Sequence, residues 1–128
     1  MPPIFATSTF EHGNRANFDY TRSGNPNFKI LENVLKGLEN SDYCTVFSSG
    51  ISAVTAIVSS LKSGDKILCE SNLYGCTIRM FEKIFRKFGI QTSYFDFTNK
   101  EYIQQISKVK PSLIWLESPT NPLLKILN

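Results

Sequence analysis

The chain has 128 residues, of which 41% are hydrophobic and 20% are charged, and its formal net charge is +3. This content allows one modest hydrophobic core, and so small a net charge gives no argument for nucleic-acid binding. The three cysteines follow no metal-binding or disulfide pattern, the apolar stretches are too short to span a bilayer, and the N-terminus does not read as a signal peptide. We therefore expect a cytoplasmic protein without a metal centre that contacts neither membrane nor nucleic acid.

Glycines and asparagines are frequent in the first 25 residues and hydrophobic periodicity is absent there, which predicts an irregular arm. Asn25 can cap a following helix, and Pro26 can occupy its first position. Apolar residues then repeat at helical spacing as far as about Asn40. The sequence thus predicts an arm followed by one long helix.

Beyond Asn40, short apolar segments alternate with segments of helical periodicity. The pattern predicts strands at 43–47, 66–70, 90–95 and 112–117, the last one buried, and helices at 51–62, 75–88 and 101–107. Gly89 is expected to end the second of these helices. Strands that alternate with helices indicate an α/β fold, in which a mostly parallel sheet is flanked by helices.

Three polar turns follow predicted strands, at residues 48–50, 71–75 and 117–121. Because ligands bind at the carboxyl ends of parallel strands, we expect these turns to lie at the ligand-binding edge of the sheet. The first turn, Ser48-Ser49-Gly50, leads into a helix whose N-terminal N–H groups can hold a phosphate. For Gly50 the alternative is a glycine that is needed only for helix–sheet packing.

Four motifs follow one another along the chain: Tyr20-Thr21-Arg22-Ser23-Gly24-Asn25-Pro26, Ser48-Ser49-Gly50, Leu73-Tyr74-Gly75-Cys76-Thr77 and Glu117-Ser118-Pro119-Thr120-Asn121-Pro122. In this order they resemble the transsulfuration (cysteine and methionine metabolism) family of pyridoxal-phosphate enzymes. The resemblance covers nearly the whole chain. It implies a fold type I PLP-dependent transferase-like structure, pyridoxal 5'-phosphate as cofactor and amino acids as substrates.

The family's chain continues well beyond Asn128, so the resemblance implies an N-terminal fragment. Residues 1–25 would be an arm that contacts the neighbouring subunit. Residues 26–128 would be the first part of an incomplete, PLP-binding large domain. The family's Schiff-base lysine, and the aspartate that pairs with the pyridinium nitrogen, match no residue present here, and we therefore expect the chain to be inactive alone.

The resemblance also implies roles for individual residues. Gly50 and Ile51, together with Ser49, are expected to bind the cofactor phosphate. Tyr74 matches the family's catalytic tyrosine, which stacks on the cofactor ring and helps to handle the substrate's proton. Asn121 matches the residue that hydrogen-bonds the ring hydroxyl oxygen.

Two further residues point to an oligomer. Tyr20 and Arg22 stand two apart, so an extended segment would direct both side chains the same way, as a phosphate clamp. In the family the matching pair reaches the phosphate of the neighbouring subunit, which implies a homo-oligomer. An exposed surface pair is the alternative.

The choice of reaction depends on smaller features. Cys76 is typical of methionine γ-lyases, whereas Pro119–Lys125 and Tyr20–Pro26 look more like the cystathionine γ-synthase and γ-lyase branch. Together they favour a cystathionine γ-synthase-like activity, a γ-replacement on an activated homoserine. The alternatives are a cystathionine β- or γ-lyase, a methionine γ-lyase, and a non-catalytic truncated or split-enzyme piece. Glu117 ends its strand and could orient neighbouring polar groups, or could simply be solvated.

Overall fold

The computed structural model describes residues 2–13 and 17–127, and residues 1–48 and 49–128 form two compact units. Residues 14–16 of the predicted arm lie outside the described residues. The packing boundary after Ser48 places the first helix with the arm. The functional division at residue 25 between a subunit-contacting arm and a cofactor domain stays a prediction.

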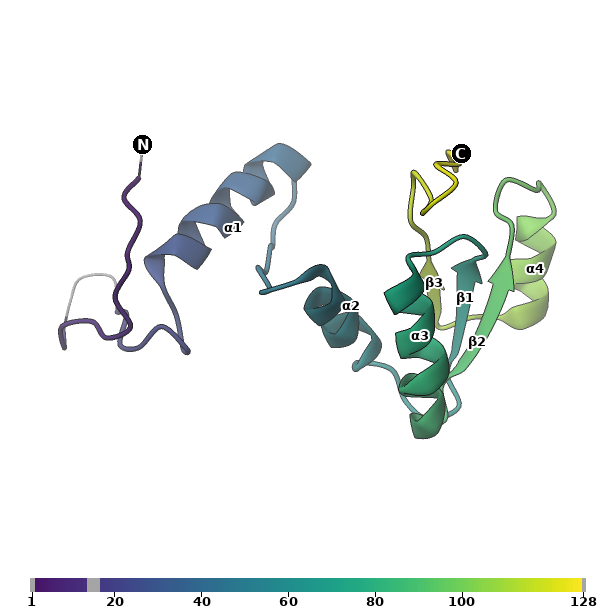
Figure 1. Cartoon of the computed structure of the whole chain (residues 1–128), viewed down its shortest axis with the longest axis horizontal. Coiled ribbons are helices and arrows are strands. Elements are labelled where there is room, and N and C mark those ends of the chain that lie inside the picture. Colours follow the sequence, from purple (N-terminus) through teal and green to yellow (C-terminus); the bar gives the residue numbers. More distant parts are fainter. Residues whose placement is uncertain (1, 14–16, 128) are drawn as a thin grey trace. The chain divides into compact units, whose positions relative to one another are not determined.

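The N-terminal unit contains helix α1 (Pro26–Glu39), and both of its ends follow from local sequence (Figure 1). The Asn25 Oδ1 accepts a hydrogen bond of 2.8 Å from the N–H of Asn27, and Pro26 occupies the first helical position. Asn40 closes the helix in the left-handed conformation, with φ of 48°. The predicted helix is therefore confirmed at both ends.

The arm before α1 is irregular, as predicted, but it is fastened to the helix. Thr9 and Tyr20 form an antiparallel bridge. The Asn27 side chain accepts from the N–H of Phe5 at 2.9 Å and donates to the carbonyl of the same residue at 2.8 Å. Because one amide side chain satisfies both backbone groups of Phe5, the start of the arm lies beside the start of α1.

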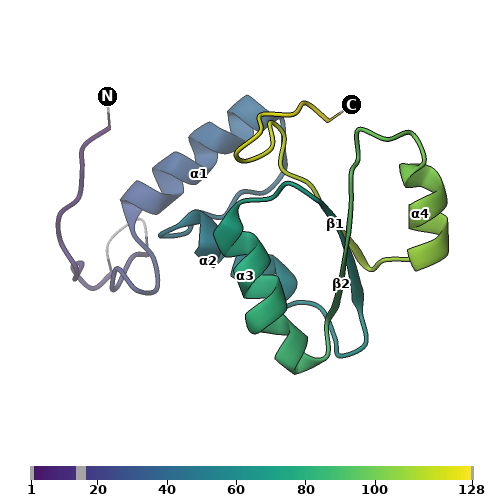
Figure 2. The same cartoon turned by 45° about the vertical axis from the view of Figure 1, so that its right-hand side comes forward.

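The second unit contains a parallel sheet of three strands within the described residues. Its strands are β1 (Lys66–Glu70), β2 (Gln91–Phe95) and β3 (Leu113–Trp115), in the order β2-β1-β3. The helices are α2 (Gly50–Val58), α3 (Gly75–Lys83) and α4 (Tyr102–Val109), and the 3₁₀-helix η1 (Phe85–Phe88) follows α3. Helix α3 lies on one side of the sheet and α4 on the other (Figures 1 and 2). The predicted α/β class with a parallel sheet is confirmed.

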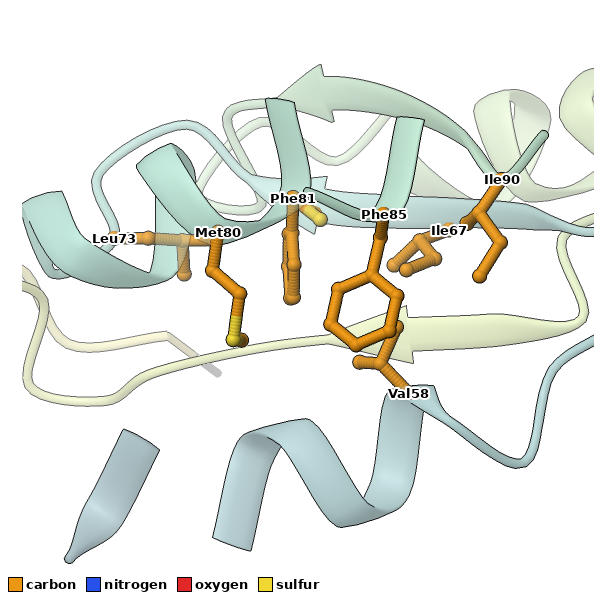
Figure 3. Packing of buried hydrophobic residues seen from close by; sticks show 8 residues of the cluster. Val58, Ile67, Leu73, Met80, Phe81, Phe85 and Ile90 are labelled. Carbon is orange, nitrogen blue, oxygen red and sulfur yellow. The ribbon is translucent and has the colours of Figure 1, made fainter. Parts of the chain in front are cut away.

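The hydrophobic core lies between β1, α2 and α3. Ile67 and Cys69 stand two residues apart on β1, so both side chains face this core. Leu68, between them, is buried on the opposite side of the strand. Figure 3 shows Phe85 and Val58 pointing toward each other across it. The other buried members are Leu73, Met80, Phe81 and Ile90. The single modest core expected from composition is present, and it is confined to the second unit.

The predicted strand at 43–47 is wrong: the structure assigns no strand to these described residues. A strand needs a neighbour for its backbone groups, and the sheet of the second unit consists of β1, β2 and β3. Here the N–H of Val46 donates to Glu32 Oε1 at 3.2 Å, and Tyr43 is 90% exposed. The segment is apolar, as a strand would be, but its backbone does not pair with a strand of the sheet.

Three other elements differ from their predictions, two in their boundaries and one in its burial. Helix α2 ends at Val58 rather than near residue 62, because a serine-rich turn follows in which Ser60 Oγ donates to the carbonyl of Ile57 at 2.7 Å. The predicted helix at 75–88 is divided into α3 and η1, and Gly89 ends it with φ of 82°, as predicted. Strand β3 is half-buried rather than buried, since it lies at an edge of the sheet among the described residues.

No helix in the described part of the chain is long and apolar enough to cross a membrane.

Candidate cofactor site

One pocket of about 430 Å³ lies where α2, α3 and the segment after β3 meet. Its lining comes from the N-terminus of α2, the N-terminus of α3 and the end of the β3 segment: Ser49, Gly50, Ile51, Val54, Tyr74, Thr77 and Glu117. The three predicted polar turns therefore do converge. All of these residues belong to the second unit.

The N-terminus of α2 presents backbone donors to this pocket. Ser49 is the N-cap residue, and its Oγ accepts a hydrogen bond of 3.1 Å from the N–H of Ser52. The carbonyl of Ser49 accepts from the N–H of Ala53. This leaves the N–H groups of Gly50 and Ile51 without an intrahelical acceptor, at the positive end of the helix.

Gly50 is not required by packing. A Cβ built at this position would find no heavy atom of the described chain within 4 Å, and Gly50 is not among the glycines with positive φ. Close packing of helix on sheet within the described chain therefore does not explain this glycine. The space that a Cβ would take opens beside free N–H groups, so the site fits a phosphate that approaches the backbone closely.

Tyr74 is held at the start of α3 by a residue distant in sequence. Its backbone N–H donates to Glu117 Oε2 at 2.8 Å, and the hydroxyl of Thr77 donates to Glu117 Oε1 at 3.1 Å. Trp115 Nε1 approaches the same oxygen at 3.4 Å. Glu117 therefore orients polar groups rather than being solvated, and it leaves the phenol of Tyr74 half-exposed on the pocket wall.

The phenol of Tyr74 belongs to a small polar cluster. Its hydrogen bond with Cys76 is the main cause that raises the pKa of Tyr74 above the ordinary value, and the positive charge of Arg79 opposes this rise. Arg79 Nη2 lies 3.5 Å from Cys76 Sγ. A phenol is protonated at neutral pH at its ordinary pKa, and the raised pKa of Tyr74 extends the protonated range to higher pH.

Glu70 is a buried carboxylate that the sequence analysis does not single out, and it is not among the described residues that line the pocket. It is the last residue of β1 and is fully buried, where it accepts from the N–H of Phe97 at 2.9 Å, from Ser71 Oγ at 2.8 Å and from the N–H of Asn72 at 3.0 Å. Burial raises the pKa of this carboxyl, but the hydrogen bonds outweigh burial and the net pKa lies below the ordinary value. The signal in the sequence is a charged residue directly after the apolar run Ile67-Leu68-Cys69 and directly before Ser71-Asn72.

Two predicted groups lie elsewhere. Asn121 is not among the described residues that line the pocket; it follows the buried Thr120, whose hydroxyl accepts from the N–H of Lys125 at 2.9 Å. Tyr20 and Arg22 belong to the N-terminal unit, where the guanidinium carbon lies 5.3 Å from the centre of the phenol ring. The segment is a turn rather than the extended backbone that the spacing argument assumes, since the N–H groups of Ser23 and Gly24 both donate to the carbonyl of Tyr20. The role of the pair as a phosphate clamp stays a prediction.

The family model described as Cys/Met metabolism PLP-dependent enzyme matches residues 1–128. The chain belongs to this family. Human cystathionine γ-lyase is 35% identical over the whole chain, and cystathionine β-lyase of Staphylococcus haemolyticus is 38% identical over 98% of it. The chain spans about a third of the length of these relatives, 32% and 33% respectively.

The fold agrees with this assignment. A crystal structure of cystathionine γ-synthase from Xanthomonas oryzae, in complex with cystathionine, superposes on 98% of this chain and 34% of its own with a TM-score of 0.86 and 32% identity. The resemblance, the fold class and pyridoxal 5'-phosphate as the cofactor of the family are thus confirmed.

Proposed function

We propose that this chain is the N-terminal part of the PLP-binding domain of a transsulfuration enzyme acting on amino acids in the cytoplasm. One observation carries the proposal. The unpaired N–H groups of Gly50 and Ile51 and the ring of Tyr74 line a single pocket, in a family that depends on this cofactor. An anion cradle beside an aromatic wall fits a phosphorylated aromatic ring.

In this proposal each residue has a separate task. The start of α2, with Ser49, Gly50 and Ile51, holds the phosphate, and Tyr74 forms the wall against the ring. Once bound, the cofactor supplies an electron sink for charge that develops on the amino-acid substrate. Tyr74 is the catalytic residue of this chain, since its phenol Oη holds a proton at neutral pH and can exchange it with the substrate.

Asn121 is proposed to hydrogen-bond the ring hydroxyl oxygen of the cofactor. It follows Thr120, and the turn that contains it is closed by hydrogen bonds between Thr120 and Lys125. That closure supports a defined position for the amide of Asn121, which we assign from the family motif.

Tyr20 and Arg22 are proposed to bind the cofactor phosphate of a neighbouring subunit in a homo-oligomer. The guanidinium stacked on the phenol is already oriented, so less side-chain freedom is lost when it binds a phosphate. An analytical ultracentrifugation series with and without cofactor tests this assembly. Arg22→Ala should weaken cofactor binding only at chain concentrations where the wild type associates.

The lysine that carries the cofactor is proposed to come from sequence outside these 128 residues. Lys125, which follows the last of the four motifs, forms an ion pair with Asp96 at 2.8 Å, and this contact raises its pKa. A lysine must lose its proton to act as a nucleophile, and this contact opposes that loss. Lys125 is therefore better explained as a structural residue.

The reaction itself is proposed to be γ-replacement on an activated homoserine, as in a cystathionine γ-synthase. The closing motif from Pro119 to Lys125 and the segment from Tyr20 to Pro26 favour the cystathionine γ-synthase and γ-lyase branch over a methionine γ-lyase, and within that branch we propose the synthase. A methionine γ-lyase is the second candidate, because such enzymes typically carry a cysteine at the position of Cys76. A non-catalytic or split-enzyme piece stays the alternative of a different class.

Binding of pyridoxal 5'-phosphate to the 128-residue chain is the experiment that tests this function. We expect weak, non-covalent binding that perturbs the amide signals of Gly50 and Ile51. Borohydride should then leave no stoichiometric pyridoxyl-lysine in a mass spectrum. Absence of any perturbation at the start of α2 would contradict the phosphate site, and a specific lysine adduct would contradict the assignment of the lysine to another sequence.

A further inference from the structure

Two helices begin at the same pocket. Residues Ser49, Gly50 and Ile51 at the start of α2 line it, and so do Tyr74 and Thr77 at the start of α3. Each helix N-terminus carries about half a positive charge and free N–H groups, so each can attract an anion. A ligand with a single phosphate could therefore bind it at the start of α2 or at the start of α3.

The two helix starts differ in the charge beside them. The cap of α2 is the neutral hydroxyl of Ser49. Beside the start of α3 lies the carboxylate of Glu117, which accepts from the N–H of Tyr74, the residue before the helix, at 2.8 Å and from the hydroxyl of Thr77 at 3.1 Å. A full negative charge at this distance offsets the positive end of α3, while the positive end of α2 is left available.

The carboxylate is also held in place from its own segment. Trp115, two residues before Glu117, packs edge-to-face against Phe81 of α3 with ring centroids 5.9 Å apart, and its Nε1 approaches Glu117 Oε1 at 3.4 Å. Phe81 is fully buried. The strand, the helix and the carboxylate therefore form one packed arrangement rather than a flexible contact.

We propose that Glu117 is a positioning residue that sets the orientation of the cofactor in the pocket. By occupying the N-terminus of α3, it directs the phosphate to α2; by bonding the N–H of Tyr74, it fixes the phenol on the wall that the ring would face. This inference rests on the proposed phosphate site at α2.

The test uses the ¹⁵N-labelled 128-residue chain, titrated with inorganic phosphate and, separately, with pyridoxal 5'-phosphate. In the wild type we expect saturable shifts at the amides of Gly50 and Ile51. In Glu117→Gln, which keeps the shape but not the charge, we expect a second saturable set at the amides of Gly75 and Cys76. A loss of stability alone would not create that new anion site.

Two further variants complete the design. Glu101→Gln removes the same charge from the N-cap of α4, outside the pocket, and should leave both sets of amides unchanged. Glu117→Asp keeps the charge but is one methylene shorter, so we expect the Tyr74 amide to exchange with solvent about tenfold faster, without a second anion site. The aspartate variant carries the test if the glutamine variant does not fold.

The outcomes separate the two proposals. Wild-type shifts at Gly50 and Ile51, with none at Gly75 and Cys76 in Glu117→Gln, would overturn the role of Glu117 and leave the phosphate site standing. Shifts at Gly75 and Cys76 in Glu117→Gln, with none at α2 in either protein, would support the exclusion of anions from the start of α3 by Glu117. The same result would overturn the phosphate site at α2. Unchanged Tyr74 exchange in Glu117→Asp would overturn the positioning of Tyr74.

Discussion

Glu117 and Tyr74 are separated by 43 residues, yet the carboxylate of the first accepts a hydrogen bond of 2.8 Å from the backbone N–H of the second. The contact forms because β1 and β3 are parallel neighbours, so the segments that leave their carboxyl ends emerge side by side. It joins two of the family's four motifs in one hydrogen bond. The geometry of the candidate site therefore depends on the pairing of the sheet.

Gly50→Ala tests whether the phosphate needs the space at the start of α2. Because a Cβ would meet no described atom within 4 Å, we expect the free energy of unfolding to be unchanged or slightly higher. Affinity for pyridoxal 5'-phosphate should fall about tenfold, which corresponds to ~1.4 kcal/mol. Calorimetry and a binding titration measure the two quantities.

Gly37→Ala is the matched control for that variant, since Gly37 is also helical and its added Cβ would also lie in open space. It should stabilise α1 by about 0.5–1 kcal/mol without any change in cofactor affinity. Equal affinity in Gly50→Ala and the wild type would remove Gly50 from the phosphate site.

Tyr74 can be examined by comparing two substitutions. Tyr74→Phe keeps the aromatic face and should retain the affinity for the cofactor, whereas Tyr74→Ala should lower it about three- to tenfold, the usual range for an aromatic contact. Fluorescence titration of the chain with the cofactor measures both. Equal affinities in all three proteins would show that Tyr74 does not contact the ring.

The titration of Tyr74 provides a second check. Its pKa is raised first of all by the hydrogen bond with Cys76 and is lowered by Arg79. We therefore expect Cys76→Ala to bring the pKa down toward the ordinary value, and Arg79→Ala to raise it further. Tyrosine ring signals followed by NMR between pH 8 and pH 12 would show either shift, and an identical pKa in all variants would contradict the cluster.

The ion pair between Asp96 and Lys125 predicts a pH-dependent contribution to stability. The hydrogen bond from Lys125 is the main cause that lowers the pKa of Asp96 from 3.8 to about 2. A carboxyl with a depressed folded-state pKa stabilises the fold above its unfolded pKa, and this contribution is lost as the pH falls from about 4 to about 2. Asp96→Asn should therefore lower the Tm at pH 7, and the difference should vanish near pH 2.

Thermal unfolding followed by circular dichroism between pH 2 and pH 7 measures this effect. Lys125→Met should behave like Asp96→Asn, whereas Lys87→Met, at an exposed lysine of η1, should leave the Tm unchanged. A difference in Tm that persists unchanged down to pH 2 would rule out the ion pair as its cause.

The cysteines should differ in reactivity. Cys69 is fully buried in the core, and burial raises its pKa to about 12, whereas Cys44 and Cys76 are half-buried. At pH 8 a thiol reagent should therefore modify Cys44 and Cys76 and spare Cys69 until denaturant is added. Peptide mapping after labelling identifies the sites, and rapid labelling of Cys69 in the native chain would contradict the packing of this core.

Sequence alone determined the features that depend on nearby residues. Asn25 and Pro26 predicted the start of α1, and Gly89 predicted the end of the helical segment that closes with η1. Hydrophobic periodicity predicted the remaining helices, because caps and amphipathic faces act within a few residues. The order of the four motifs was enough to identify the family. Only the tertiary structure decided which strands pair, because backbone pairing joins distant segments whose local patterns are alike. It therefore decided that residues 43–47 form no strand, that Glu70 is buried among hydrogen-bond donors, and that the carboxylate of Glu117 accepts from the N–H of Tyr74 beside the start of α3.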